Sequence, residues 1–121
     1  MYVRAIRGAI TVDSNTESDI FSQTQKLISQ IITKNSLKHE DIISIIFTVT
    51  DDITAAYPAA AVRQMGIVDV PLMCMREMKV PGSLEKCIRV LIHINTMKAK
   101  TDMRHVYLEG AKCLRPDITE E

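Results

Sequence analysis

A run of nine alternating residues, Cys87–Asn95, constrains the fold of this chain more than any other feature of its sequence. Side chains two positions apart lie on the same face of a β-strand. One face of this strand is aliphatic throughout, and it consists of Ile88, Val90, Ile92 and Ile94. The other face is mixed and carries Arg89, which on spacing alone would point to water from an antiparallel sheet. We therefore expect a strand with one face in the core.

Similar patterns divide the rest of the chain into short elements, with no internal repeat. Strands are predicted at residues 2–12, 42–50, 68–75, 85–96 and 105–109, and helices at residues 17–34 and 59–65. Thr16 suits the N-cap of the first helix, and Pro58 and Gly66 suit the two ends of the second. In the second strand, the residues expected to face the first helix are Ile43, Ile45, Phe47 and Val49. The predicted fold class is α/β (α+β), a mixed β-sheet with helices on one face.

The composition indicates one domain that binds neither nucleic acid nor a membrane. A chain of 121 residues with 46% hydrophobic residues can bury a single core. Fifteen basic residues balance fifteen acidic ones, and the aromatic residues are three tyrosines and two phenylalanines. The sequence thus lacks both the basic surface and the stacking platform that nucleic acids require. Because no segment resembles a signal peptide or a membrane span, we expect a cytoplasmic protein.

The cysteines and histidines have no spacing that is typical of a metal site. Cys74, Cys87 and Cys113 are odd in number and form no C-x-x-C motif, which argues against a disulfide framework and a structural zinc. None of the three histidines has a ligand-like neighbour in the sequence, and so we predict no metal. Four methionines are expected to fill the core instead of binding a metal, namely Met65, Met73, Met75 and Met78.

Several predicted strands carry a mixed face that the two helices cannot cover. The polar members of these faces are Arg7, Thr48, Arg89 and Tyr107, and the apolar members include Ala5, Ile46 and Leu91. Guanidinium groups among aliphatic side chains suggest a pocket for an anion. The apolar residues favour association of identical subunits over full solvation. We therefore expect a homo-oligomer with pockets at its interfaces.

Five ordered motifs extend over nearly the whole chain. They are Arg4-Ala-Ile-Arg7-Gly-Ala, Ala56-Tyr-Pro-Ala with Ala61-Val-Arg63, Val70-Pro-Leu-Met-Cys74-Met-Arg-Glu77-Met, Lys86-Cys-Ile-Arg89-Val, and Arg104-His-Val-Tyr107-Leu-Glu with Leu114-Arg115-Pro-Asp. In these motifs the chain resembles the monofunctional AroH-class chorismate mutases. The resemblance implies one chorismate mutase domain over residues 1–121, with a flexible C-terminal tail from about residue 113. It also implies that three subunits pack as a pseudo α/β-barrel homotrimer with active sites at the interfaces.

The activity that the resemblance implies is the Claisen rearrangement of chorismate to prephenate, on the route to phenylalanine and tyrosine. This reaction transfers no proton and needs no cofactor, so the enzyme binds a compact substrate conformer and stabilises developing charge. By family position, Arg89 donates to the ether oxygen. Glu77 accepts from the ring hydroxyl, which the backbone or thiol of Cys74 also contacts. Arg7 and Tyr107 are expected to hold the side-chain carboxylate of chorismate.

Other family positions line the mouth of the pocket or the adjoining tail, some of them from the neighbouring subunit. These are Tyr57, Arg63, Met73, Leu114 and Arg115. The sequence departs from the family at one of them, because Ala60 stands where a lysine is common. One cationic contact to the substrate is therefore missing or is supplied by another residue.

Two other functions fit the same residues. A trimeric imine or enamine deaminase also places an arginine against a substrate carboxylate at a subunit interface, and Glu77 and Cys74 can be given roles in it. A trimeric regulator without turnover would use the arginines to hold a phosphate or carboxylate effector. Loss of the ultraviolet absorbance of chorismate would distinguish the mutase from both alternatives.

Overall fold

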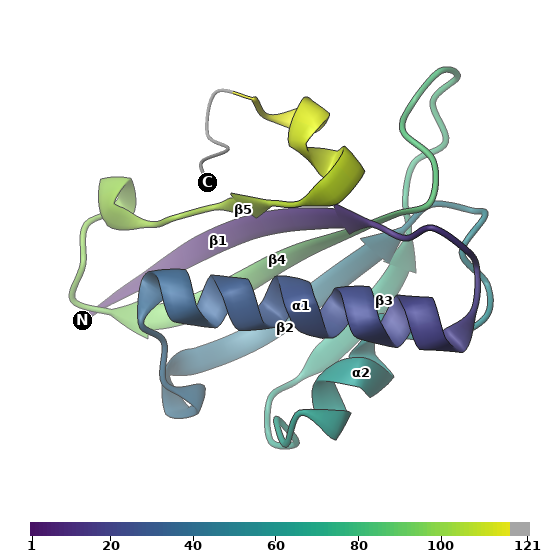
Figure 1. Cartoon of the computed structure of the whole chain (residues 1–121). Coiled ribbons are helices and arrows are strands. Elements are labelled where there is room, and N and C mark those ends of the chain that lie inside the picture. The colour runs from purple at the N-terminus through teal and green to yellow at the C-terminus, as the bar shows by residue number, and fades with distance from the viewer. Residues whose placement is uncertain (117–121) are drawn as a thin grey trace.

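The computed structural model of the chain describes residues 1–116 and contains a five-stranded sheet with two α-helices on one face (Figure 1). The strands are β1 (Tyr2–Thr11), β2 (Ile42–Val49), β3 (Leu72–Arg76), β4 (Cys87–Thr96) and β5 (Val106–Tyr107). The helices are α1 (Glu17–Asn35) and α2 (Pro58–Gln64), and short 3-10 helices are η1 (His39–Asp41), η2 (Lys100–Asp102) and η3 (Glu109–Leu114). The predicted α+β fold with a mixed sheet is confirmed.

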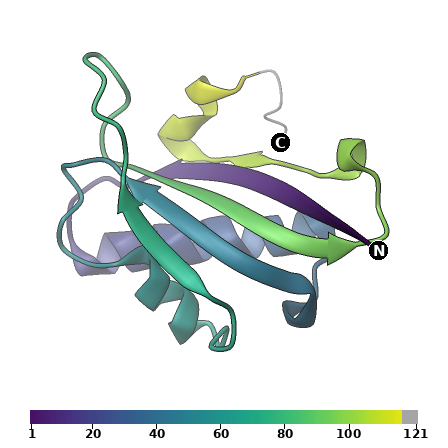
Figure 2. The same cartoon turned by 180° about the vertical axis from the view of Figure 1, so that it is seen from behind.

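The strands lie in the order β3-β2-β4-β1-β5. The central strand β4 is antiparallel to both β1 and β2, whereas the edge strands β3 and β5 run parallel to their neighbours. Both α-helices lie on the face that Figure 1 presents. Figure 2 shows the opposite face, over which no α-helix of residues 1–116 lies. We call this second face the open face.

The core forms between the aliphatic face of the sheet and α1. Thr16 caps this helix, since its side chain accepts a hydrogen bond from the Asp19 backbone N–H. Ile20, Leu27, Ile28 and Ile31 of α1 are fully buried, as are Ile88 and Ile92 of β4. Gly8 permits the close approach of helix and sheet, because a Cβ there would lie 2.9 Å from both Ile31 Cδ1 and the Val106 carbonyl oxygen. The aliphatic face of β4 is therefore in the core, as predicted.

A β-bulge at the start of β2 makes the predicted orientation of Ile43 wrong. The register of β2 against β4 shifts between Ile42 and Ser44. An extra residue in a strand moves its neighbours to the other face. Ile42 is consequently buried and Ile43 is 36% exposed, although the alternation had placed Ile43 against the helix. Beyond the bulge Ile45 and Phe47 are fully buried, as predicted.

The strand boundaries near the sheet edges also differ from the prediction. β3 begins only at Leu72, because Pro71 before it has no N–H for the ladder. β5 contains two residues instead of five, and the chain leaves the ladder at Glu109, which has a φ of 52°. η3 then follows directly and includes the first two residues of the expected tail, while residues 117–121 of that tail lie outside the described residues.

Candidate active site

Four strands contribute to a row of residues across the open face. Arg89 of β4 is paired with Thr48 of β2 on one side and with Ala9 of β1 on the other. Ala9 is also paired with Tyr107 of β5. Because Ile88 and Val90 point into the core, Arg89 between them projects from the open face. The sheet register therefore brings two of the predicted site residues, Arg89 and Tyr107, onto the same face.

Glu77 faces Arg89 and is held in place by β2. The Glu77 backbone N–H donates to the Val49 carbonyl at 2.8 Å, which fixes the chain just after β3. The Thr48 hydroxyl donates to Glu77 Oε1 at 2.5 Å, and the same oxygen lies 3.7 Å from Arg89 Nε. The side chains of Arg89 and Glu77 are 43% and 24% exposed, so both are accessible to a ligand. The structure thus brings together the two main catalytic candidates.

Arg89 retains donors for an anion beyond its contact with Glu77. A guanidinium has five N–H donors in a planar fork.

Cys87, two residues before Arg89 on the same face, is buried, and burial raises the pKa of its thiol to about 11 against the opposing charge of Arg89. This thiol is therefore protonated at neutral pH and is a poor nucleophile. The cysteine serves as part of the apolar floor of the site.

The C-terminal segment covers one end of the open face. Tyr107 is 6% exposed and forms a small apolar cluster with Ala9, Cys87 and Ala111. Leu114 packs against this cluster from the end of η3. The segment is anchored to β1, since the Gly110 backbone N–H donates to the Thr11 hydroxyl at 2.9 Å. The C-terminal part of the chain thus places Tyr107 and Leu114 together.

Arg7 and Arg115 both lie near His105, which directly precedes β5. The Arg7 backbone N–H donates to His105 Nδ1 at 3.0 Å. Partial burial lowers the pKa of His105, and the positive charges of Arg7 and Arg115 lower it further. Both guanidinium groups are therefore close enough to the imidazole to act on it electrostatically. Together with Arg89 they give this end of the open face a positive character.

The remaining predicted residues lie near the β3 edge of the sheet, away from Tyr107. Cys74 is paired with Phe47, so its thiol points to the helical side and not to the open face. Burial raises the pKa of this thiol, while a hydrogen bond with the Ala59 backbone and the charge of Arg63 oppose the increase. In one chain the thiol is therefore separated from Arg89 by the sheet. Of the two contacts expected for Cys74, only its backbone is near the open face.

A pocket of about 540 Å³ lies at this β3 edge. Its lining includes Tyr57, Ala60 and Cys74. Tyr57 is 71% exposed and is the N-cap residue of α2, directly before Pro58. The predicted site residues thus fall into two groups within one chain. One group surrounds Arg89 and Tyr107. The other lies on or next to α2 and β3, where Tyr57 and Cys74 line this pocket and Arg63 and Met73 do not.

Three of the four methionines do not fill the core of the single chain. Met73, Met75 and Met78 are 58%, 44% and 79% exposed. Only Met65 packs against the core, so the prediction is wrong for the other three. Their location explains the difference, because the exposed methionines lie on edge strand β3 and in the segment that follows it. Exposed apolar side chains at a sheet edge are typical of an interaction surface.

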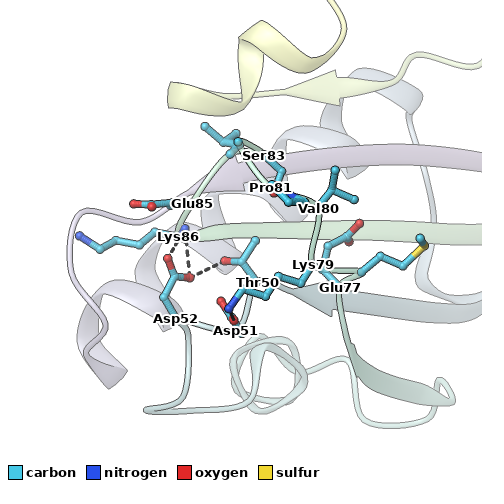
Figure 3. Close-up of a pocket in the computed structure, with 13 residues that line it drawn as sticks. Thr50, Asp51, Asp52, Glu77, Lys79, Val80, Pro81, Ser83, Glu85 and Lys86 are labelled. Atoms are coloured by element: carbon cyan, nitrogen blue, oxygen red, sulfur yellow. Dashed lines mark hydrogen bonds and ion pairs between the residues drawn. The ribbon is translucent and has the colours of Figure 1, made fainter.

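The segment between β3 and β4 forms a projecting loop with a second pocket at its base, of about 720 Å³ (Figure 3). Both carboxylate oxygens of Asp52 accept from the Lys86 backbone N–H, at 3.0 and 3.1 Å. Asp51 forms an ion pair with Lys79 at 3.1 Å. Glu77 lines the same pocket, which therefore adjoins the Arg89 site. The two aspartates thus anchor this loop.

Two residues that contribute to the site were not singled out as site residues from the sequence. The sequence pattern places Thr48 on the mixed face of its strand and indicates no role for His105. Each forms a hydrogen bond to a residue far away in the chain. Thr48 bonds to Glu77, and His105 bonds to Arg7. In the sequence, the one available signal for Thr48 is a hydroxyl on the same predicted face as Arg89.

The part of the chain that the structure describes contains neither a metal-binding cluster nor a membrane-spanning helix. Within residues 1–116, three or more His, Cys, Asp or Glu side chains are nowhere grouped so that they could hold a metal ion. Over the same range, the helices are too short or too polar to cross a membrane.

The sequence of the chain matches a known enzyme family, and the fold and the arginine-lined face agree with that match. The sequence model of type I chorismate mutases matches residues 3–118. The chain therefore belongs to the type I chorismate mutase family and is an enzyme of that class.

Individual relatives support the same conclusion. The chain is 44% identical to the chorismate mutase AroH of Bacillus subtilis over 120 residues, which covers 98% of this chain and 94% of that protein. It is 47% identical to the AroH enzyme of Thermus thermophilus over 117 residues, or 96% of each chain. The solved structure of a chorismate mutase from Clostridium thermocellum is 60% identical and superposes with a TM-score of 0.89, over 90% of this chain and 97% of that one.

Proposed function

We propose that this chorismate mutase converts chorismate to prephenate by binding its compact conformer and stabilising the charge that develops as the ether bond breaks. In this rearrangement one carbon–oxygen bond breaks and one carbon–carbon bond forms within the same molecule. The step belongs to the synthesis of phenylalanine and tyrosine. The observation that carries the proposal is the Thr48–Glu77–Arg89 arrangement on the open face, because it presents a fixed guanidinium beside a fixed carboxylate.

Arg89 would donate to the ether oxygen and to a substrate carboxylate. The geometry supports this role, since the guanidinium is partly exposed and is oriented by Glu77. Glu77 would also accept a hydrogen bond from the ring hydroxyl of chorismate. Arg7 and Tyr107 would bind the side-chain carboxylate at the other end of the site. These roles assign the negative groups of the substrate to cations and its hydroxyl to an acceptor.

A neighbouring subunit would complete the site. In one chain Tyr57, Arg63 and Met73 are remote from Tyr107, and joining the two groups requires the edge of one subunit to meet the open face of another. Leu114 and Arg115 would adjoin the same pocket from the C-terminal segment. The exposed methionines of β3 support this arrangement, because association would remove them from water. A homotrimer with a pseudo-barrel packing is therefore part of the proposal, as is the cytoplasmic location expected from the sequence.

We predict that the protein sediments as a trimer. The measured mass should be three times the 13.6 kDa of one chain, because the apolar residues of the open face and of β3 would be buried between subunits. Sedimentation equilibrium at micromolar concentrations measures this directly. A monomer that persists there and retains full activity would contradict the shared site.

Ala60 is a point of difference within the proposed pocket. It lines the edge pocket beside Tyr57 and Cys74, at the position where the resemblance to the family implies a lysine. A methyl group cannot pair with a carboxylate. We therefore infer that the difference affects substrate affinity more than the chemical step, which depends on Arg89.

The direct test of the activity is incubation of the protein with chorismate. Its ultraviolet absorbance should fall as prephenate forms, without any added cofactor or metal. The family comparison favours this outcome over an imine deaminase or a regulator without turnover. Unchanged absorbance with folded protein would contradict the proposed function.

We predict that turnover is nearly independent of pH between about pH 7 and 8.5. The reaction needs Arg89 and Glu77 charged but transfers no proton between enzyme and substrate. The shifted groups near the site do not titrate in this range, because the pKa of Cys87 is raised to about 11 and that of His105 is lowered from 6.5. Steady-state kinetics in buffers of constant ionic strength measure the profile. A bell-shaped curve centred near neutrality would indicate acid–base chemistry instead.

A further inference from the structure

We infer that His105 is a positioning residue, which holds the main chain of Arg7 so that its guanidinium can bind a substrate carboxylate. The inference rests on the proposed role of Arg7 in the site. Its structural basis is the 3.0 Å hydrogen bond from the Arg7 backbone N–H to His105 Nδ1. His105 would not touch the substrate, and it would act only through Arg7.

The imidazole continues the β1–β5 ladder beyond the end of β5. The paired residues of this short ladder are Gly8 with Val106 and Ala9 with Tyr107. The N–H groups of residues two apart in a strand point to the same side, so those of Arg7 and Ala9 are both directed toward β5. At Arg7, the acceptor is the side chain of His105 instead of a backbone carbonyl. This side chain therefore gives β1 a hydrogen-bond partner one residue beyond the last backbone pair of the ladder.

Accepting this hydrogen bond requires one particular form of the imidazole. Nδ1 must be unprotonated, which places the proton of the neutral ring on Nε2. The surroundings favour the neutral ring, because partial burial lowers the pKa of His105 and two cations lower it further. These cations come from two elements, Arg7 from β1 and Arg115 from the segment after η3. The bond and the electrostatic surroundings thus select the same form.

Protonation of His105 would remove the acceptor and add a third positive charge. Since its pKa in the folded protein lies below the ordinary value of 6.5, this change occurs only under acidic conditions. As the pH falls below 6.5, the unfolded chain takes up the proton first, so the folded protein loses stability in this range. The hydrogen bond from Arg7 to His105 should therefore be fully formed at neutral pH and be lost toward acidic pH.

The test compares His105→Asn with His105→Ala, and uses His39→Asn as the control at an exposed histidine in η1. An asparagine Oδ1 can replace Nδ1 as acceptor and does not titrate in this range. We expect the KM for chorismate to rise roughly three- to tenfold in His105→Ala, with kcat changed much less. His105→Asn should keep KM within about twofold of the unchanged protein at neutral pH. It should also lose less kcat/KM on acidification than the unchanged protein does.

A purely structural role predicts a different pattern, in which both substitutions lower stability and neither separates KM from kcat. Equal damage by asparagine and alanine would overturn the inference, and so would a KM for His105→Ala close to that of His39→Asn. Circular dichroism and sedimentation establish that each variant is folded and assembled.

Nitrogen-15 NMR of the unsubstituted protein provides a measurement that needs neither activity nor a folded variant. The ring of His105 should show an unprotonated Nδ1 and a protonated Nε2 at neutral pH. A protonated Nδ1 would contradict the inference outright. If the unsubstituted protein left chorismate unchanged, the proposed function would fail, whereas the NMR result would still decide whether His105 accepts from Arg7.

Discussion

Replacing Arg89 with lysine is expected to lower kcat by two to three orders of magnitude, although the positive charge is retained. The transition state places charge on an ether oxygen that needs a donor of fixed reach and direction. Arg89 has such a direction because it projects from the central strand β4 and contacts Glu77. Loss of one preorganised donor of this kind costs about 3–4 kcal/mol of transition-state stabilisation. A lysine ammonium cannot reproduce the planar fork.

Steady-state kinetics on the folded, assembled Arg89→Lys protein measure this effect. The matched control is Arg4→Lys, because Arg4 contacts the Tyr2 ring and the Lys98 carbonyl at the other end of β1. The control should keep its kcat. A kcat for Arg89→Lys within a few-fold of the parent value would mean that Arg89 is not the donor to the ether oxygen.

Replacing Glu77 with glutamine is expected to lower kcat/KM by about ten- to a hundredfold. The amide has nearly the same shape and can still accept from Thr48, but it removes the charge that faces Arg89. Hydrogen bonds to a charged group contribute about 1.5–3 kcal/mol, and the contact with the substrate hydroxyl would become a neutral one. Orientation of Arg89 would weaken at the same time, so the loss should include kcat.

The corresponding control is Glu85→Gln, which removes an exposed carboxylate from the same loop. Each variant removes one negative charge, so long-range electrostatic effects are matched. We expect Glu85→Gln to have nearly unchanged kinetics. Equal activities of the two variants would show that the Glu77 charge is not used in the reaction.

The sequence predicted those parts of the fold that depend on local patterns. Alternation identified the aliphatic face of β4, and helical spacing with the Thr16 cap identified α1. The errors arose where distant contacts override a local pattern. The bulge that turns Ile43 outward depends on pairing with β4, and the early end of β5 depends on the turn at Glu109.

The same distinction applies to the candidate site. The family motifs predicted Arg89 and Glu77 as site residues, and the structure places Arg89 Nε 3.7 Å from Glu77 Oε1. Thr48 could not be assigned to Glu77 from spacing, because 29 residues separate them in the chain and only the sheet brings them together. The expected thiol contact of Cys74 depended on which face of β3 it occupies, and the pairing with Phe47 directs it to the helical side.

The central claim is that Arg89 and Glu77 act on the substrate in a site shared between subunits. The most direct measurement is a crystal structure with a bicyclic ether dicarboxylate that has the shape of the chair-like transition state. We predict the Arg89 guanidinium within about 3.2 Å of the ether oxygen and Glu77 at the hydroxyl, with Arg63 or Tyr57 of a neighbouring subunit closing the pocket. A ligand bound within one subunit, or with its ether oxygen away from Arg89, would contradict the account.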